Sequence, residues 1–136
     1  MRFPIVIHKD PDSSYGVTVP DLPGCFSAGD TIEQAIDCAH EAIMLHIEGL
    51  LMQGASIPIR APLEVHRTDE NLADGIFAVV AVDLSKLAGK PKRVSIAMPS
   101  HLLAIIDEAA SREGESRSGL IARAALRFLE RQAGEQ

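Results

Sequence analysis

The sequence predicts an α+β protein made of two domains. The first 84 residues contain short apolar strands and one long amphipathic helix, the pattern of a sheet with a helix packed against it. A strand and two short amphipathic helices follow from residue 92. The polar segment 85–91 (SKLAGKP) contains glycine and proline and is typical of a linker. We therefore expect domains at residues 1–84 and 92–136, joined by this linker.

The strands of the first domain follow from β-branched composition and from the turns between them. Residues 3–8 (FPIVIH) are short and apolar, a composition that strands favour. The turn cluster 9–14 (KDPDSS) then predicts that residues 15–19 (YGVTV) return as the second strand of a hairpin. Residues 25–28 (CFSA) predict a short third strand. Residues 76–84 (IFAVVAVDL) are almost wholly apolar, which predicts a central buried strand.

The clearest helix of the first domain is predicted over residues 31–53. Asp30 can cap its first turn, and Glu33 stands three residues later, where a capping box has its acidic partner. Gly54 follows the periodic stretch and can adopt the left-handed conformation that ends many helices. Apolar residues recur at steps of three and four and form a single stripe: Ile32, Ile36, Ala39, Ile43, Ile47 and Leu50.

Residues 92–98 (KRVSIAM) show an alternation that predicts one more strand. Val94, Ile96 and Met98 form an apolar face. The opposite face carries small or polar side chains: Arg93, Ser95 and Ala97. Pro99 is expected to end the strand, because proline cannot donate a hydrogen bond to a neighbouring strand.

Two short helices are predicted after this strand. Ser100 caps the first, which begins near His101 and stops at Gly114. Ser116 caps the second. Their apolar sides are formed by Leu102, Ile105, Ile106 and Ala109 in the first helix, and by Ile121, Ala124, Ala125, Phe128 and Leu129 in the second. Each helix must therefore cover one apolar side by packing against another element.

A strand and two helices of this size cannot bury their apolar faces alone. The strand needs an antiparallel partner for its backbone groups, and about 45 residues is close to the size below which oligomerisation is usually required. Two copies that pair their strands satisfy both needs. The sequence therefore predicts a ribbon-helix-helix dimer whose exposed ribbon enters the major groove of DNA.

The outer face of such a ribbon predicts the residues that contact DNA. Arg93 is expected to bind guanine, Ser95 can donate or accept a hydrogen bond, and Ala97 can touch a thymine methyl group. The N-terminus of the second helix offers backbone N–H groups to a phosphate. Phosphate contacts are therefore predicted at Lys90, Lys92, Ser116, Arg117 and Ser118.

The distribution of charge also divides the chain. Residues 1–89 hold five basic and thirteen acidic side chains, a net charge of −8, whereas residues 90–136 hold eight basic and six acidic, a net charge of +2. The second part can face phosphates, while the first suits a cationic protein partner. No apolar run approaches the roughly 20 residues of a membrane span, so we expect no membrane partner and a cytoplasmic protein.

No pattern in the sequence predicts catalysis, a metal or a cofactor. Cys25 and Cys38 are expected to remain reduced, since no CxxC pair or Cys/His cluster is present. The carboxylates that could form a two-metal nuclease site fall in separate turns or at a strand end: Asp10, Asp12, Asp21 and Asp83. The histidines are scattered along the chain. We therefore expect a protein that acts by binding.

Two stretches of the chain carry a resemblance to a known family. YGVTVPDLPGCFSAGDTIEQAIDCAHEAI, from Tyr15, is similar to HicB-family antitoxins, in which a tyrosine strand leads into Pro-Asp-Leu-Pro-Gly-Cys, a Gly-Asp-Thr turn and an alanine-rich helix. RVSIAMPSHLLAIIDEAASREGESRSGLIARAALRFLE, from Arg93, resembles the ribbon-helix-helix repressors of toxin–antitoxin systems. Together with the join VVAVDLSKLAGKPKRV, the resemblance covers nearly the whole chain.

The resemblance implies an antitoxin with two roles. The first domain is expected to have a partial ribonuclease H-like fold and to neutralise HicA, a small basic toxin that cleaves mRNA. The second domain is expected to bind promoter DNA of its own operon as a homodimer, which could pair again into a tetramer. Candidate toxin contacts are Asp10, Asp12, Tyr15, Asp21 and Leu22.

One other function stays open on the sequence alone. A stand-alone transcription factor would use the second domain in the same way and the first domain to sense a small ligand or a protein. A small basic toxin encoded by the neighbouring open reading frame would favour the antitoxin, whereas a metabolite that changes DNA affinity would favour the sensor.

Overall fold

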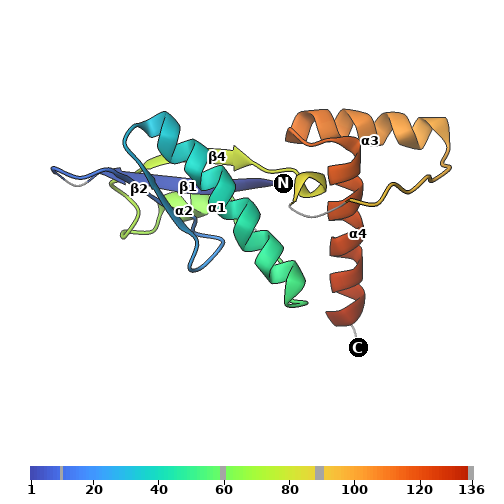
Figure 1. Ribbon diagram of the computed structural model, residues 1–136, viewed down its shortest axis with the longest axis horizontal. Helices are drawn as coiled ribbons and strands as arrows, with labels where there is room; N and C mark the ends of the chain where they lie inside the picture. Colours follow the sequence, from blue (N-terminus) through green and yellow to red (C-terminus); the bar gives the residue numbers. More distant parts are fainter. Residues whose placement is uncertain (10, 59–60, 88–90, 135–136) are drawn as a thin grey trace. The chain divides into compact units, whose positions relative to one another are not determined.

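The chain forms two compact units, and Figure 1 shows the ribbon coloured from blue at the N-terminus to red at the C-terminus. The computed structural model describes residues 1–9, 11–58, 61–87 and 91–134. The first unit spans residues 2–80, and the second comprises residue 1 with residues 81–136. The sequence analysis ended the first domain at residue 84, whereas residues 81–84 cluster with the C-terminal helices in the structure.

The first unit is built on a four-stranded antiparallel sheet of order β3-β2-β1-β4. β1 (Arg2–Lys9) and β2 (Tyr15–Thr18) form the predicted hairpin, in which Lys9 lies opposite Tyr15. β3 (Phe26–Gly29) pairs with the other side of β2. The predicted positions of these three strands are confirmed to within one residue or two.

β4 (Ile76–Ala81) lies at the edge of the sheet, next to β1. Just beyond the two strands, the amino group of Met1 donates to the Val82 carbonyl at 2.8 Å and the Val82 N–H donates to the Met1 carbonyl at 2.7 Å, the exchange typical of an antiparallel pair. The prediction of a central buried strand was wrong, because Ile76 and Val79 are about half exposed. A continuous apolar run does not by itself distinguish a central strand from an edge strand.

Helix α1 (Ile32–Met52) packs against β1, β2 and β3. Ala39, Ile43 and Ile47 of the predicted stripe are fully buried, whereas its other members, Ile32, Ile36 and Leu50, are partly exposed. Ala35, which was not predicted as part of the stripe, is fully buried as well. The cap lies one residue later than predicted, because Thr31 is the residue with extended backbone and its Oγ1 accepts from the Gln34 N–H at 3.1 Å. Gly54, with a φ of 69°, takes the predicted left-handed conformation after the helix.

The other face of the sheet is covered by the segment between α1 and β4. It contains a short helix, α2 (Leu63–Arg67), that the sequence analysis did not predict. Asp21 fastens this segment, because its Oδ1 accepts from the Ala61 N–H at 3.1 Å and lies 2.9 Å from His66 Nε2. The first unit therefore has a sheet with covering structure on both faces.

The second unit contains a 3₁₀ turn, η1 (Leu84–Lys86), and two helices, α3 (Ser100–Glu113) and α4 (Arg117–Gly134). Gly114, with a φ of 68°, ends α3 as predicted. The predicted cap of α4 is confirmed, since the Ser116 Oγ accepts from the Gly119 N–H at 3.0 Å. Ser100 is instead the first helical residue of α3, and Pro99 precedes it without a side-chain cap.

Residues 91–99 form no strand in this single chain. The sequence analysis expected a strand here that pairs with a second copy, and a lone chain provides no neighbouring strand for residues 92–98.

Candidate functional site

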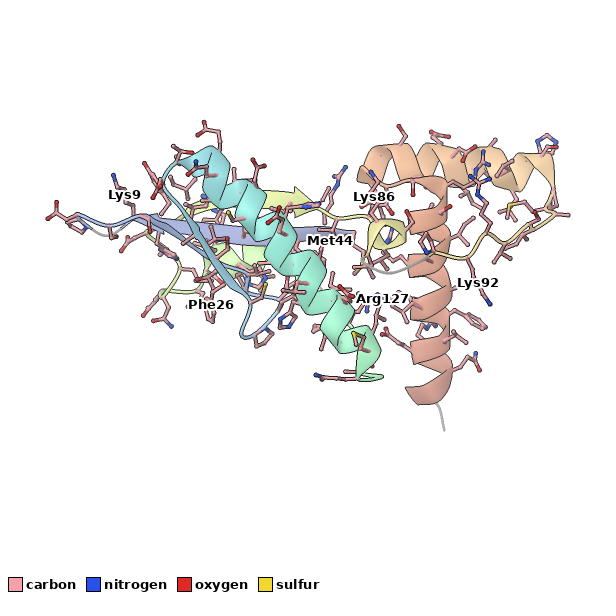
Figure 2. The ribbon with its side chains drawn as sticks, in the orientation of Figure 1. Lys9, Phe26, Met44, Lys86, Lys92 and Arg127 are labelled. Atoms are coloured by element: carbon pink, nitrogen blue, oxygen red, sulfur yellow. The ribbon has the colours of Figure 1, made fainter. Side chains whose placement is uncertain are left out.

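The residues expected to read DNA lie on the segment that precedes α3. Arg93, Ser95 and Ala97 are all exposed, as is Lys92, which projects from this segment in Figure 2. Among the described residues, no turn, loop or cap hydrogen bond of the backbone involves residues 92–98. Lys90, another predicted phosphate contact, lies outside the described residues. The segment thus presents both polar side chains and unpaired backbone groups.

The apolar positions of the same segment are exposed as well. Val94 is 75% exposed and Ile96 is 63% exposed. The apolar sides of α3 and α4 share this property through Leu102, Ile105, Phe128 and Leu129. Within residues 91–132, the buried hydrophobic side chains reduce to Ala110. The second unit therefore carries an apolar surface that its own fold leaves uncovered.

An open groove of about 1020 Å³ lies between the segment 91–98 and the first turns of α4. Its apolar lining comes from Val94, Ile96, Met98, Leu103 and Ile121. Lys92, Arg93 and Arg117 place positive charge at the same groove. The groove therefore combines an uncovered apolar wall with basic side chains.

The N-terminus of α4 is bound by a carboxylate of its own unit. Asp83 accepts from the Ser116 N–H at 2.9 Å and from the Ser85 N–H and hydroxyl at 2.9 and 2.7 Å. Burial alone would raise the pKa of Asp83, but these hydrogen bonds from Ser116 and Ser85 lower the pKa to about 2. The predicted phosphate contact at Ser116 is thus already supplied with an anion.

Arg117, another predicted phosphate contact, also has an acidic partner. Its Nε and Nη2 donate to the two carboxylate oxygens of Asp107 on α3, at 2.8 and 2.9 Å. This hydrogen-bonded pairing lowers the pKa of Asp107 and raises the pKa of Arg117 from their usual values. Ser118, the third predicted contact at this helix start, is exposed.

A buried ion-pair cluster lies between α3 and α4. The side chain of Glu115 is fully buried, and its carboxylate lies 2.8 Å from the amino group of Met1 and 2.8 Å from Arg123 Nη2. Burial alone would raise the pKa of Glu115, but the hydrogen bonds from Arg123 and from the amino group of Met1 lower it. The cluster therefore fixes the turn that separates the two helices, and the sequence analysis did not find it.

The structure separates the residues that were predicted to contact a toxin. Asp12 is exposed and has a φ of 64°, and Tyr15 is partly exposed beneath Lys9, whose Nζ lies 5.1 Å from the ring centroid. Leu22 is fully buried, and the carboxylate of Asp21 holds His66. Asp21 and Leu22 therefore have structural roles here, because their side chains face the interior. Asp10 lies outside the described residues.

The outward side of α1 is an acidic surface that the sequence analysis overlooked. The helix contains four acidic residues and no lysine or arginine. Glu33, Asp37 and Glu41 are exposed and follow one another at steps of four, so they share one side of the helix. Leu45, 71% exposed, continues the same row by one further turn. The spacing of these acidic residues can be read from the sequence, but the sequence analysis considered only the apolar side of this helix.

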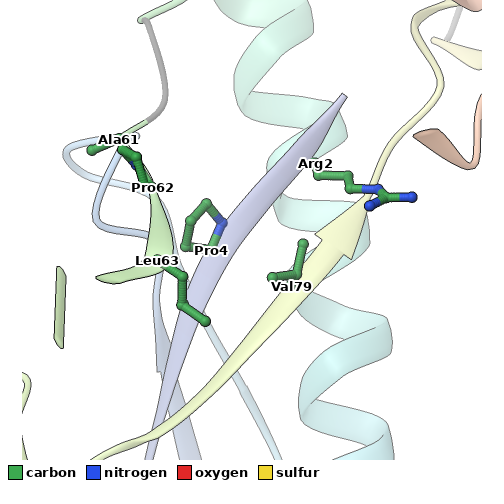
Figure 3. A pocket seen from close by; sticks show the side chains of 6 residues that line it. All are labelled: Arg2, Pro4, Ala61, Pro62, Leu63 and Val79. Atoms are coloured by element: carbon green, nitrogen blue, oxygen red, sulfur yellow. The ribbon is translucent and has the colours of Figure 1, made fainter. Parts of the chain in front are cut away.

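The first unit also has a small hollow of about 270 Å³ on the α2 side of its sheet. Figure 3 shows Pro4 of β1 beside Pro62 and Leu63, Val79 on the neighbouring strand β4, and the Arg2 guanidinium directed away from them. The lining offers no group of converging polar side chains, which a small-molecule site usually requires.

The described residues form no metal site, disulfide or membrane-spanning helix. They contain no group of three or more His, Cys, Asp or Glu side chains placed to hold a metal ion. Both cysteines are free, and burial raises the pKa of the Cys25 thiol above its usual value. None of the helices in these residues is long and apolar enough to span a membrane.

Comparison with known proteins decides the family. A family model described as a HicB-like antitoxin of bacterial toxin–antitoxin systems matches residues 3–125. The chain belongs to this family. The resemblance to HicB-family antitoxins is therefore confirmed.

Two relatives of this HicB-like chain match it over nearly its whole length. A 14.9 kDa protein encoded in the rep–hol intergenic region of Haemophilus phage HP1 is 42% identical over 131 residues, which cover 95% of this chain and 98% of the phage protein. The crystal structure of the Burkholderia pseudomallei antitoxin HicB is 43% identical, with a TM-score of 0.75 over 95% of this chain and 98% of that one.

A solved complex contains a further relative. The structure of the HicA3 and HicB3 toxin–antitoxin complex includes a chain that is 32% identical to this one, with a TM-score of 0.54. The match covers 61% of this chain and 99% of that chain.

Proposed function

We propose that this HicB-like chain is an antitoxin with two binding activities. Its first unit binds and inhibits a HicA-type toxin that cleaves mRNA, and its second unit binds the promoter DNA of its own operon and represses it. Both partners belong to the bacterial cytoplasm, where we expect the protein to act. The chain acts by binding rather than by catalysis.

The observation that carries DNA binding is the surface around residues 91–98. Arg93 and Ser95 are exposed beside uncovered apolar residues and unpaired backbone groups. Paired with the same segment of a second copy, Val94 and Ile96 would turn toward the helices, and Arg93, Ser95 and Ala97 would form the outer face of a ribbon. Such a ribbon fits the major groove, where arginine discriminates guanine.

A second copy of this chain is the occupant proposed for the groove. Its strand would supply hydrogen bonds to residues 92–98 and its helices would cover Leu102, Ile105, Phe128 and Leu129. Such large side chains are each worth about 1.5–3 kcal/mol when fully buried. The second unit is thus proposed to be a homodimer of ribbon-helix-helix type.

The toxin is proposed to bind the acidic side of the first unit. Glu33, Asp37 and Glu41 repel one another at steps of four along α1, and the helix contains no lysine or arginine that would relieve this repulsion. A cationic partner would do so, and Leu45 offers an apolar contact at the end of the row. Asp12 and Tyr15 remain proposed contacts, whereas the burial of Leu22 and the internal bonds of Asp21 remove those two from the proposed surface.

Two single substitutions test both activities in one experiment. Arg93→Ala should weaken binding to promoter DNA by about 1–3 kcal/mol, because an arginine–guanine contact is lost, and should leave toxin binding unchanged. Asp37→Lys should weaken binding of the protein encoded by the neighbouring open reading frame and leave DNA binding unchanged. Calorimetry with that protein and gel-shift assays with the promoter measure the two affinities. Loss of both affinities in either variant would contradict separate binding surfaces.

The sensor alternative receives less support from the structure. The apolar hollow of Figure 3 has no converging polar groups that would select a metabolite.

A further inference from the structure

At the start of α4, two groups that could bind a phosphate donate hydrogen bonds to acidic side chains of the same unit. The Ser116 N–H donates to Asp83, and the Arg117 guanidinium donates to Asp107. Both groups are among those proposed to meet DNA phosphates. The second unit therefore contains its own competitors for the positions that phosphate would occupy.

The two acids differ in how firmly they are held. Asp83 is buried and accepts from Ser85 and Ser116, and a Cβ atom at position 119 would overlap its carboxylate. Removing Asp83 from this place would break the contacts that fasten η1 to α4. Asp83 is therefore a structural anion rather than an exchangeable one.

Asp107 is held by Arg117 alone among the described residues. The side chains of Arg117 and Asp107 are 53% and 44% exposed, so water screens their attraction. The pairing uses two parallel hydrogen bonds. A phosphate group offers an arginine the same two-oxygen geometry, and the dense charge of DNA favours the phosphate.

We propose that Asp107 is an intramolecular competitor of DNA phosphate for Arg117, and that DNA binding transfers the Arg117 guanidinium from this carboxylate to a backbone phosphate. The inference rests on the proposed binding of promoter DNA. Because phosphate contacts carry no sequence information, this competition lowers affinity for all DNA and leaves discrimination to Arg93. Asp107 thereby limits unproductive binding to other sequences.

The test compares Asp107→Asn with Glu108→Gln in the full-length chain. Glu108 lies on the same helix, is exposed and faces Arg112 at 3.6 Å, so its substitution changes the net charge equally without releasing Arg117. Asp107→Asn should tighten binding to the promoter duplex by about two- to five-fold, the range expected for an exposed ion pair. Glu108→Gln should change this affinity much less.

An Arg117→Ala background separates competition from general repulsion. Without the arginine, Asp107→Asn should no longer tighten DNA binding, since nothing is left to release. In the unaltered chain, the Arg117 Nε–H resonance in NMR spectra should shift when the promoter duplex is added, a readout that requires no substitution.

The outcomes distinguish this inference from the function on which it rests. Equal tightening by Asp107→Asn and Glu108→Gln, or tightening that persists beside Arg117→Ala, would overturn the competition and leave promoter binding intact. Absence of any promoter binding by the unaltered chain and by Asp107→Asn would overturn the proposed function, and the competition with it.

Discussion

The two units of this chain treat their large apolar side chains in opposite ways. The first unit buries Phe3, Ile5 and Ile43 completely between its sheet and α1. The second unit leaves Val94, Phe128 and other large apolar residues more than half exposed. Burial of apolar surface is the main favourable term in folding. The first unit therefore has a buried apolar core within one chain, whereas the second buries few apolar side chains, which is the basis for proposing that it associates with a second copy.

Both units hold polar groups with buried carboxylates: Asp21 contacts His66 in the first unit, and two carboxylates have this role in the second. The fully buried Glu115 holds Met1 and Arg123, and Asp83 holds the start of α4. Buried ion pairs order a structure but add little net stability, because removing charges from water is costly. The second unit thus has defined polar contacts around its turns without a large apolar core. Association of two copies would supply the missing apolar burial.

Substitution of one exposed leucine in each unit tests this difference and has the largest expected effect. Leu129→Asp should abolish self-association at micromolar concentration and promoter binding with it, because the interface would bury an unpaired charge. Leu45→Asp, at a leucine of α1 that is 71% exposed against 63% for Leu129, should leave the oligomeric state unchanged. Analytical ultracentrifugation measures both. A dimer that survives Leu129→Asp would place the interface elsewhere.

The charge of Asp83 gives a pH dependence of intermediate size. Its pKa of about 2 in the folded chain lies below the roughly 3.9 of an unfolded aspartate, so it contributes stability above about pH 4 and loses it as the pH falls towards 2. Asp83→Asn should therefore lower the free energy of unfolding by about 2 kcal/mol at pH 7, and by much less near pH 2.

Denaturant unfolding of the full chain, followed by circular dichroism at both pH values, measures this dependence. The exposed Asp74 of the first unit provides a control, since Asp74→Asn removes the same charge without breaking a buried contact. A deficit for Asp83→Asn that stays constant with pH would show that the charge of Asp83 is not the source of its effect.

Glycine substitutions are expected to have effects of opposite sign in the two units, of about the size expected for Asp83→Asn or smaller. Gly119→Ala should destabilise the chain by about 1–3 kcal/mol, because the added Cβ would overlap the Asp83 carboxylate. Gly49→Ala in α1, where nothing lies within 4 Å of the added atom, should stabilise it by up to about 1 kcal/mol through helix propensity. Thermal unfolding compares the two variants. Stabilisation by both would mean that Asp83 does not closely approach α4.

Much of the fold was predictable because its signals are local. The hairpin of β1 and β2, the stripe of α1 and the glycine at the end of α3 each follow from spacing within a few residues. The edge position of β4 was not predictable, because an apolar run does not specify how many strands lie beside it. The shift of the α1 cap to Thr31 is a choice between adjacent residues that can both cap.

The candidate sites also include features that local sequence patterns can predict and features that depend on the tertiary structure. Arg93 and Ser95 are exposed, but so are Val94 and Ile96, so the alternation predicted for this segment stays a prediction. Asp21 and Leu22 were candidate toxin contacts through the resemblance to HicB-family antitoxins, but Leu22 lies in the core and Asp21 is buried. Helical spacing alone is enough to place Glu33, Asp37 and Glu41 on one side of α1. Their exposure follows only from the tertiary structure, in which the opposite side of α1 packs against the sheet.

By itself, the sequence determined the order and approximate ends of the longer helices and of the strands in the first unit, and the division of the chain by charge. Tertiary structure alone decided which distant polar groups meet: Asp83 with Ser116, 33 residues away, and Asp21 with His66, 45 residues away. Periodicity, caps and turns are set by neighbours in the chain, so a sequence displays them. A buried carboxylate instead accepts hydrogen bonds from whichever donors the fold places within about 3 Å. Because these donors are distant in the sequence, no local pattern predicts the pairing.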